Sequence, residues 1–157
     1  MKIKLICFGK IKNSDLKSAI SDFEKRIKHY IDFEIIELLE EKINNENNKS
    51  EIENALRKEA SKLEKYLENK INIILDVDSK QYDSIEFSNI IKENVASWKQ
   101  INFFIGSSYG FSDEIKNRFQ YKISFSKMTF NHQIFRLMLC EQIYRSFCII
   151  NNIKYHK

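Results

Sequence analysis

The stretch INFFIGSSYG, residues 101–110, decides the fold of this 157-residue chain. Its first five residues are almost continuously apolar, which is typical of a strand in a sheet that is covered on both faces. The stretch INIILDV, residues 71–77, has the same character. Segments with helical periodicity flank both stretches. Strands and helices that alternate in this way predict an α/β protein with a mainly parallel sheet.

The same periodicities place the remaining elements. We expect strands at residues 2–8, 33–39, 71–77, 101–105 and 121–125. We expect helices at residues 14–30, 50–68, 84–98, 112–119 and 133–150, the first of them capped by Ser14 or Asp15. No internal repeat, low-complexity tract or boundary divides the chain, so a single domain over residues 1–157 is predicted.

Composition excludes several classes of protein. Hydrophobic residues make up 43% and charged residues 31% of the chain, which favours a soluble globular protein over a disordered one. No apolar run reaches the roughly 18 residues of a membrane span. The N-terminus passes directly from a short apolar run into charged sequence, which predicts a first strand and not a signal peptide. Three cysteines without metal-ligand spacing indicate free thiols in a reducing cytoplasm: Cys7, Cys140 and Cys148.

Charge is distributed unevenly along the sequence. Residues 116–157 contain eight basic residues and one acid, a net charge of +7, whereas residues 1–115 carry a net charge of −3. Such a block indicates either an anionic partner, most commonly a nucleic acid, or a solvated basic surface without a partner. The basic residues are Lys116, Arg118, Lys122, Lys127, Arg136, Arg145, Lys154 and Lys157.

The predicted last helix, residues 133–150, is apolar on nearly every side. A helix in a single layer on a sheet would leave one such face in water. A homodimer would cover that face; the alternative is a buried helix of a monomer with two snorkelling arginines. Arg136 and Arg145 are nine residues apart, roughly 180° around the helix. One could therefore face the site of its own protomer and the other the partner.

Three loops are candidates for a ligand site, because ligands of parallel sheets bind beyond the carboxyl ends of the strands. They follow Leu75, Ile105 and Phe125. The second contains two of the three glycines, which allow close backbone approach to a ligand, but it matches neither a Walker A nor a GxGxxG motif. The third, residues 124–132, combines apolar side chains that could flank an adenine with backbone groups that could bond its edges.

Other groups of residues that could bind a metal or act in catalysis give little indication of a site. No spacing of His and Cys predicts a metal site, and no Ser-His-Asp order stands out. Asp76 and Asp78 at a strand end could bind Mg²⁺, but a solvated strand end is the favoured interpretation. His132, just before the last helix, is expected to be a structural cap or a hydrogen-bonded anchor and not a base.

Four segments together resemble one family. They are MKIKLICFGKIK at residues 1–12, LDVDSK at 75–80, FFIGSSYGFS at 103–112 and the sequence from 123 to the end. The last segment contains, in order, S-x-x-T-x-x-H, R-x-x-x-x-E-Q-x-Y-R and a Y-H tail. Over its whole length the chain is similar to the bacterial large-subunit ribosomal RNA pseudouridine N3-methyltransferases of the SPOUT (α/β-knot) superfamily.

The resemblance implies a deep trefoil knot within approximately residues 101–150, formed where loops 106–110 and 126–132 are threaded; knots are rare exceptions among folds. It implies S-adenosylmethionine bound in a bent shape in that knot, no metal, and an obligate cytoplasmic homodimer with composite sites. It implies as substrate a pseudouridine of 23S rRNA near the decoding centre, methylated at N3 on the assembled ribosome. The family's cofactor positions correspond to Leu75, Gly106, Ser107, Gly110, Ser126, Lys127, Met128, Thr129, Phe130 and Asn131.

Two positions depart from the family pattern. The family has a second glycine where this chain has Ser107, and a proline where it has Asn131. The first change puts a side chain at an expected backbone contact with the cofactor.

Removal of the N3 proton requires a base or a solvent relay. His156 is the candidate, either as that base or as a group that orients the substrate. Tyr155 could stack on the target base, and Arg136 or Arg145 could hold phosphate.

Two other functions remain open from sequence. A non-catalytic ribosome- or RNA-binding protein would use the same basic segment, but it would need no apolar loop pair around Gly106 and Met128. A SPOUT enzyme that acts on tRNA is the second alternative, and the absence of an added RNA-binding domain in the sequence counts against it.

Overall fold

A computed structural model describes residues 1–67, 70–97 and 100–156, and it confirms the predicted alternation of strands and helices. The strands are β1 (Lys2–Phe8), β2 (Asp32–Leu38), β3 (Ile71–Gln81), β4 (Gln100–Ile105) and β5 (Tyr121–Ser124). The helices are α1 (Ser14–Ile27), α2 (Lys49–Leu67), α3 (Ser84–Ser97), α4 (Asp113–Lys116) and α5 (His132–Ile150). The predicted helix ends at residues 68 and 98 lie outside the described residues.

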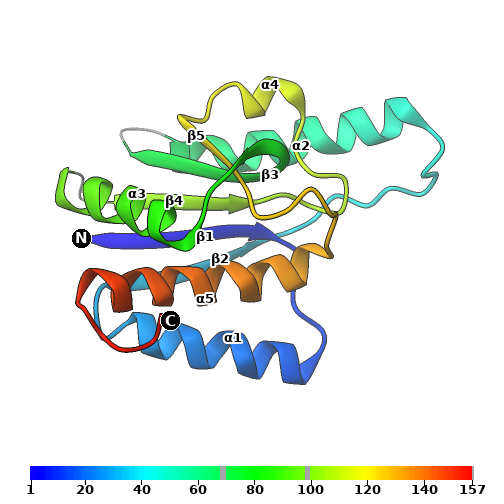
Figure 1. The fold of residues 1–157 in the computed structure, drawn as a ribbon. Coiled ribbons are helices and arrows are strands. Elements are labelled where there is room, and N and C mark those ends of the chain that lie inside the picture. Colours follow the sequence, from blue (N-terminus) through cyan, green and yellow to red (C-terminus); the bar gives the residue numbers. More distant parts are fainter. Residues whose placement is uncertain (68–69, 98–99, 157) are drawn as a thin grey trace.

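The strands form one sheet in the order β2-β1-β4-β3-β5, and every pairing is parallel (Figure 1). The chain continues from β1 to β2 at one edge and from β4 to β5 at the other. The strand order therefore reverses between the neighbours β1 and β4. In parallel sheets ligands bind near such a reversal, at the carboxyl ends of the strands.

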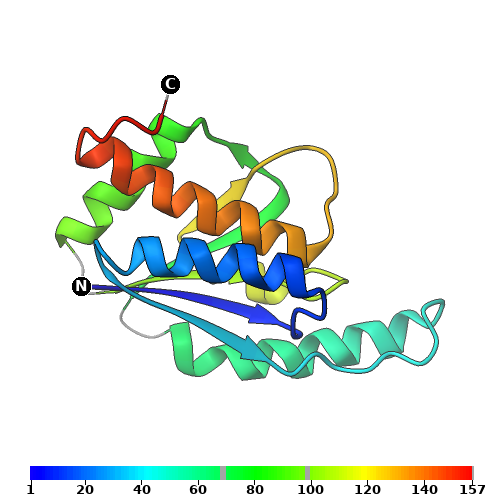
Figure 2. The same cartoon turned by 90° about the horizontal axis from the view of Figure 1, so that it is seen from below.

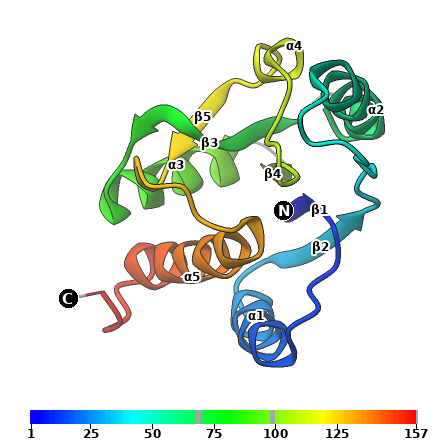
Figure 3. The ribbon, with the colours of Figure 1, turned by 90° about the vertical axis from the view of Figure 1, so that its right-hand side faces the viewer.

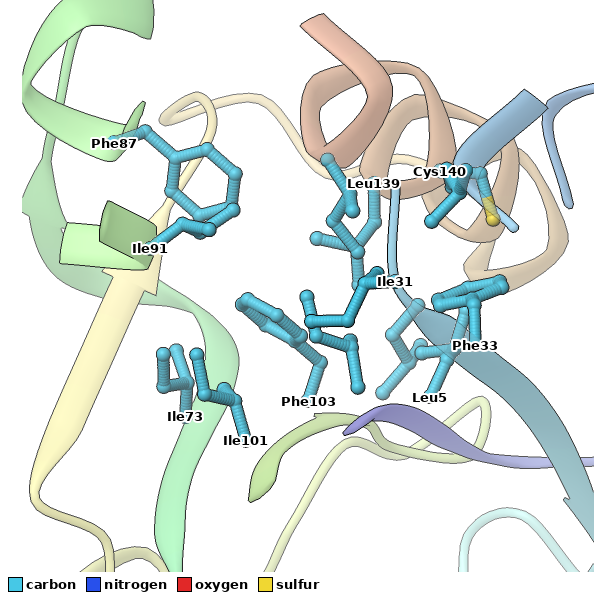
Figure 4. Close-up of a cluster of buried hydrophobic side chains, with 14 of the residues drawn as sticks. Leu5, Ile31, Phe33, Ile73, Phe87, Ile91, Ile101, Phe103, Leu139 and Cys140 are labelled. Carbon is cyan, nitrogen blue, oxygen red and sulfur yellow. The ribbon is translucent and has the colours of Figure 1, made fainter. Parts of the chain in front are cut away.

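Helices cover both faces of this sheet. α5 lies between α1 and α3 on one face, and α2 and α4 lie on the other (Figures 2 and 3). Successive residues of β4 alternate between the two cores: Phe103 packs in the α5-side cluster and Phe104 in the α2-side cluster. Figure 4 shows the first cluster, in which Phe103, Phe87 and Leu139 face the same interior. Burial on both faces explains why this strand is apolar at consecutive positions.

Several boundaries differ from the sequence-based prediction. α1 is capped by Asn13, whose Oδ1 accepts a hydrogen bond from the Leu16 backbone N at 2.8 Å, and not by Ser14 or Asp15. The helix ends at Ile27 and not at residue 30. β3 extends to residue 81, because an irregularity between Leu75 and Lys80 allows the chain to pair with β5 again.

α4 is shorter than the predicted helix 112–119. It spans four residues, and the chain then turns so that Phe119 is buried against Phe104, with ring centroids 5.0 Å apart. Burial of this large aromatic ring outweighs one further helical turn, because the stabilisation from packing exceeds that from helix propensity in so short an element.

The last helix is largely covered within the protomer. Leu139, Cys140 and Ile143 are fully buried against the sheet and its neighbours, whereas Ile134 is 45% exposed. A second copy is therefore not needed to cover most of α5, and the homodimer stays a prediction. The trefoil knot also stays a prediction.

The three cysteines are free and buried. Burial raises the pKa of the Cys7 thiol to about 12, and it also raises the pKa of Cys140. A thiol with so high a pKa contains almost no thiolate near neutral pH, so Cys7 and Cys140 are poorly suited to act as nucleophiles. None of the helices in the described ranges combines the length and the apolar character that a membrane span requires.

Candidate active site

A cavity of about 310 Å³ lies at the carboxyl ends of β3, β4 and β5. All three predicted loops contribute to its wall, which confirms their predicted convergence at this edge of the sheet. The volume is at the lower end of the ~300–1,000 Å³ usual for ligand sites. The predicted cofactor residues in the wall are Leu75, Gly106, Ser107, Gly110, Thr129 and Phe130.

The glycine turn after β4 is tightly built. A Cβ atom at Gly106 would lie 2.6 Å from the carbonyl oxygen of Gly110, which leaves no room for a side chain. Gly110 has φ +74°, and its backbone N donates to the Ser107 carbonyl at 2.9 Å. Both glycines are thus required, for close approach at one position and for left-handed backbone at the other. Ser107 is buried between them. The close approach of Gly110 restricts the residue type at position 106 and not at position 107, where this chain departs from the family pattern.

One glutamate supports this turn from outside the cavity, and a second fixes the segment next to that glutamate. Glu40 Oε1 accepts hydrogen bonds from the Ser108 backbone N at 3.2 Å and from its Oγ at 3.0 Å. Glu59 on α2 is 4% exposed and accepts from the Glu41 backbone N at 2.9 Å. Burial raises the pKa of the Glu59 carboxyl. The turn is therefore bonded directly to Glu40, a residue that its sequence pattern did not mark as part of the site.

The loop from β5 to α5 is organised by its own polar groups. Ser126 Oγ accepts from the Met128 backbone N at 2.9 Å, and the Ser126 carbonyl accepts from Ser124 Oγ at 3.0 Å. Asn131 caps α5 by accepting from the Gln133 backbone N at 2.8 Å, which gives this residue a clear role where the family has proline. Ser126, Lys127, Met128 and Asn131 are not among the residues that line the cavity, and Met128 is 71% exposed. Their contact with a cofactor stays a prediction.

His132 begins α5 and lies in the cavity wall. Burial lowers the pKa of this imidazole; nearby Arg136 acts in the same direction, and Glu40 opposes both. A histidine with a lowered pKa is neutral at pH 7. The predicted role of a structural anchor fits this position at the start of the helix.

Asp76 and Lys116 form an ion pair that their positions in the sequence did not predict. The Lys116 Nζ lies 2.9 Å from Asp76 Oδ1, and both residues line the cavity. The Asp76 side chain is only 12% exposed, so the interpretation of this residue as a solvated strand end was wrong, whereas Asp78 is exposed. The signal available in the sequence was the position of Asp76, which directly follows Leu75, a predicted cofactor residue. Among residues 1–67, 70–97 and 100–156, no group of three or more His, Cys, Asp and Glu is placed to hold a metal ion.

Arg136 is buried, with 1% of its side chain exposed. Its Nη1 lies 2.6 Å from Glu37 Oε1, and its Nη2 donates to the carbonyls of Phe8 and Gly9 at 3.2 and 3.1 Å. These contacts join the start of α5 to the ends of β1 and β2. Arg136 does not line the cavity, and its contact with phosphate stays a prediction.

The C-terminal tail folds back on α5. Arg145 Nη2 pairs with Glu141 Oε1 at 2.5 Å, and the same oxygen accepts from Tyr155 Oη at 3.1 Å. The Arg145 guanidinium lies 4.7 Å from the centroid of the Tyr155 ring. His156 Nδ1 is 3.4 Å from Arg145 Nη1. We call these four residues the tail cluster; Lys157 lies outside the described residues.

The tail cluster and the cavity are separate in one protomer. Of the described tail residues, neither Tyr155 nor His156 lines the cavity, and Arg145 does not line it either. Arg136 and Arg145 do face different surroundings, as their spacing predicted.

Four of the seven described basic residues in the C-terminal segment are paired with acids within the fold. Lys116, Arg118, Arg136 and Arg145 form ion pairs with Asp76, Glu64, Glu37 and Glu141, respectively. Three of these acids come from the acidic first 115 residues. The block of charge in the sequence therefore overstates the basic surface of the folded protein.

Comparisons with known proteins agree with this architecture. A relative from Malacoplasma penetrans, named Ribosomal RNA large subunit methyltransferase H, is 57% identical over all of both chains. A relative of the same name from Mycoplasma capricolum is 48% identical over the full length of both chains. A solved structure described as a probable methylase family protein from Haemophilus influenzae Rd KW20 has a TM-score of 0.55 and 14% identity, and the match covers 99% of this chain and 70% of that one. The last comparison supports the fold alone.

A family model described as predicted SPOUT methyltransferase matches residues 1–156. The match spans all the helices and strands, including those that build the cavity, and the described part of the tail. It confirms the expected fold class and the expected methyl transfer, for which S-adenosylmethionine is the methyl donor. This chain therefore belongs to the SPOUT methyltransferase family.

Proposed function

We propose that this protein transfers a methyl group from S-adenosylmethionine to N3 of a pseudouridine in 23S rRNA, on the assembled ribosome and in the cytoplasm. The observation that carries the proposal is the cavity at the carboxyl ends of β3, β4 and β5, built on the Gly106–Gly110 turn. Full-length relatives named large-subunit rRNA methyltransferases support the choice of substrate. A protein that only binds RNA would need no such cavity.

The cavity fits the chemical character of the methyl donor. Phe125 and Phe130 provide apolar surface for an adenine, and the glycine turn brings backbone groups close to a ligand. Leu75, at the end of the regular pairing of β3, completes the wall. These residues would hold the cofactor, which supplies the reactive methyl carbon.

Methyl transfer to a ring nitrogen needs alignment of the two reactants and removal of the N3 proton. Alignment in a fixed site can contribute about 7–11 kcal/mol of the barrier reduction. His156 is exposed and free to reach a substrate, either as the acceptor of that proton or as an orienting group. Tyr155 offers an aromatic face for stacking on the base.

We further propose that the active unit is a homodimer with composite sites. In one protomer the tail cluster lies on α5 and the described tail residues do not line the cofactor cavity. If both regions act on one substrate, a second copy must bring its tail to the cavity. A second, mainly apolar cavity of about 660 Å³ between α1, α3, β5 and α5 provides surface for that contact.

The function is tested on ribosomes from a strain that lacks this methylation. We expect purified protein and S-adenosylmethionine to add one methyl group at N3 of a 23S rRNA pseudouridine, detected by mass spectrometry of nuclease digests. Methylation of tRNA in place of ribosomes would overturn the proposed substrate.

Sedimentation tests the assembly. A homodimer has about twice the 18.8 kDa mass of the chain at micromolar concentration. A monomer that is fully active on ribosomes would overturn the composite site. Mixing two inactive variants, one altered at Gly106 and one at His156, should restore part of the activity if each site uses residues of both copies.

A further inference from the structure

An ion pair between Asp76 and Lys116 lies in the wall of the cofactor cavity. Lys116 is the last residue of α4, and Asp76 lies where β3 leaves its regular pairing with β5. The Nζ and Oδ1 atoms are 2.9 Å apart. Ser79 Oγ donates to the other carboxylate oxygen at 2.9 Å, so the carboxylate is fixed from two sides.

This pair is partly withdrawn from water. The Lys116 side chain is 23% exposed and that of Asp76 is 12% exposed. Desolvation makes such a pair more costly than one on the open surface, so it contributes little stability by itself. Its charges nevertheless remain at the border of a cavity whose other walls include Ile105, Phe111 and Phe135.

We propose that Asp76 and Lys116 bind the amino-acid end of S-adenosylmethionine. Asp76 would accept hydrogen bonds from its ammonium group, and Lys116 would donate to its carboxylate. Each of the two protein charges is opposite in sign to the charged group that it would bind. Charge-assisted hydrogen bonds of this type are stronger than neutral ones. The pair thereby selects a methyl donor that carries an α-amino acid.

The same residues have an alternative, purely structural role, which is to join α4 to the end of β3. The two roles predict different dependence on the ligand. A structural tie affects all ligands of the cavity equally, whereas a binding pair affects only ligands that contain the matching charged group.

Three probes separate these roles by calorimetry: S-adenosylhomocysteine, its decarboxylated analogue, and 5′-methylthioadenosine, which lacks both charged groups. All three have a neutral sulfur. We expect Lys116→Gln to weaken the binding of S-adenosylhomocysteine on the order of ten- to hundredfold. The affinities of the other two probes should change by no more than about twofold. We expect Asp76→Asn to weaken the binding of the first two probes and to leave the affinity for 5′-methylthioadenosine unchanged.

Arg118 provides a matched control. It lies two residues beyond Lys116 and pairs with Glu64, and it is not among the residues that line the cavity. Arg118→Gln removes the same charge from the same segment and should leave all three affinities unchanged. Equal losses for all three probes in Lys116→Gln would overturn the proposal.

A measurement on the unaltered protein covers the case in which a variant fails to fold. The protein should bind S-adenosylhomocysteine at least about tenfold more tightly than 5′-methylthioadenosine. Equal affinities would overturn the role of the ion pair, whereas failure to bind any of the probes would contradict the methyl donor itself. The two failures are therefore distinguishable.

Discussion

The two ends of α5 contrast in how an arginine is used. Arg136, near the start, is buried and bonded to Glu37 and to two backbone carbonyls of the β1 end. Arg145, near the end, is partly exposed and bonded to side chains of its own helix and of the tail. The first arginine holds the sheet and helix together beside the cavity. The second holds the C-terminal tail against α5 through its contacts with Glu141, Tyr155 and His156.

This difference separates stability from activity along one helix. Changes at the start of α5 should unfold the protein or deform the cavity. Changes at its end should leave the fold intact and act on the substrate. The following predictions test this division, from the largest expected loss of unfolding free energy to the smallest.

Arg136→Ala should lower the unfolding free energy by about 3 kcal/mol or more. The substitution leaves the Phe8 and Gly9 carbonyls without their donor and opens a cavity beside them. Urea denaturation measures the effect. Arg145→Ala is the matched control on the same helix and should cost about 1 kcal/mol or less. Similar losses for the two variants would remove the contrast between the ends of α5.

Gly106→Ala should destabilise the protein by about 1–3 kcal/mol and abolish measurable cofactor binding, because the new Cβ would lie 2.6 Å from the Gly110 carbonyl oxygen. Gly110→Ala is a useful comparison. Its Cβ would meet nothing within 4 Å, so only the left-handed backbone conformation at φ +74° opposes it. Calorimetric titration should show a smaller loss of affinity for Gly110→Ala; the reverse order would mean that close approach at Gly106 does not shape the site.

Removal of residues 155–157 should lower the unfolding free energy by only about 1 kcal/mol and leave cofactor affinity unchanged. The loss includes the bond from Tyr155 to Glu141 and the contact of its ring with Tyr144. Methylation of ribosomes should nevertheless be abolished. His156→Ala and Tyr155→Ala should lower the rate far more than they weaken ribosome binding, because an orienting group acts mainly on the transition state.

Lys157→Ala controls for the basic charge of the tail and should cost little, as one phosphate contact contributes modestly and depends on salt. A truncated protein with the original rate would place the active centre away from the tail.

The smallest expected effect on the unfolding free energy is a dependence on pH. The pKa of His132 is lowered in the folded protein by burial, below the value of about 6.5 in the unfolded chain. The unfolded state therefore binds more protons than the folded state as the pH falls below about 6.5. The contribution of His132 to the unfolding free energy is present above that pH and is lost as the pH falls through the lowered pKa. His132→Gln should reduce the loss of stability on acidification. Unfolding curves at several pH values, compared between the two proteins, measure the difference.

Sequence alone identified the features that depend on local pattern. Consecutive apolar residues in 71–77 and 101–105 predicted strands covered on both faces, and the core clusters contain them on both sides. The glycines at 106 and 110 marked the turn correctly, because only a special backbone geometry explains their place in so glycine-poor a chain. Element ends were less accurate, as at α4, where burial of Phe119 decided the boundary.

What sequence by itself determined is the parallel α/β architecture, the convergence of three loops at one sheet edge and, through its motifs, the family. Tertiary structure alone decided which charges meet. The partners Asp76 and Lys116 are 40 residues apart, and Glu37 and Arg136 are 99 residues apart. Periodicity reports the burial of one element at a time, whereas an ion pair depends on the relative position of two elements. For that reason the net charge of +7 in the last segment indicated a basic surface, whereas the fold pairs four of its seven described basic residues with acids.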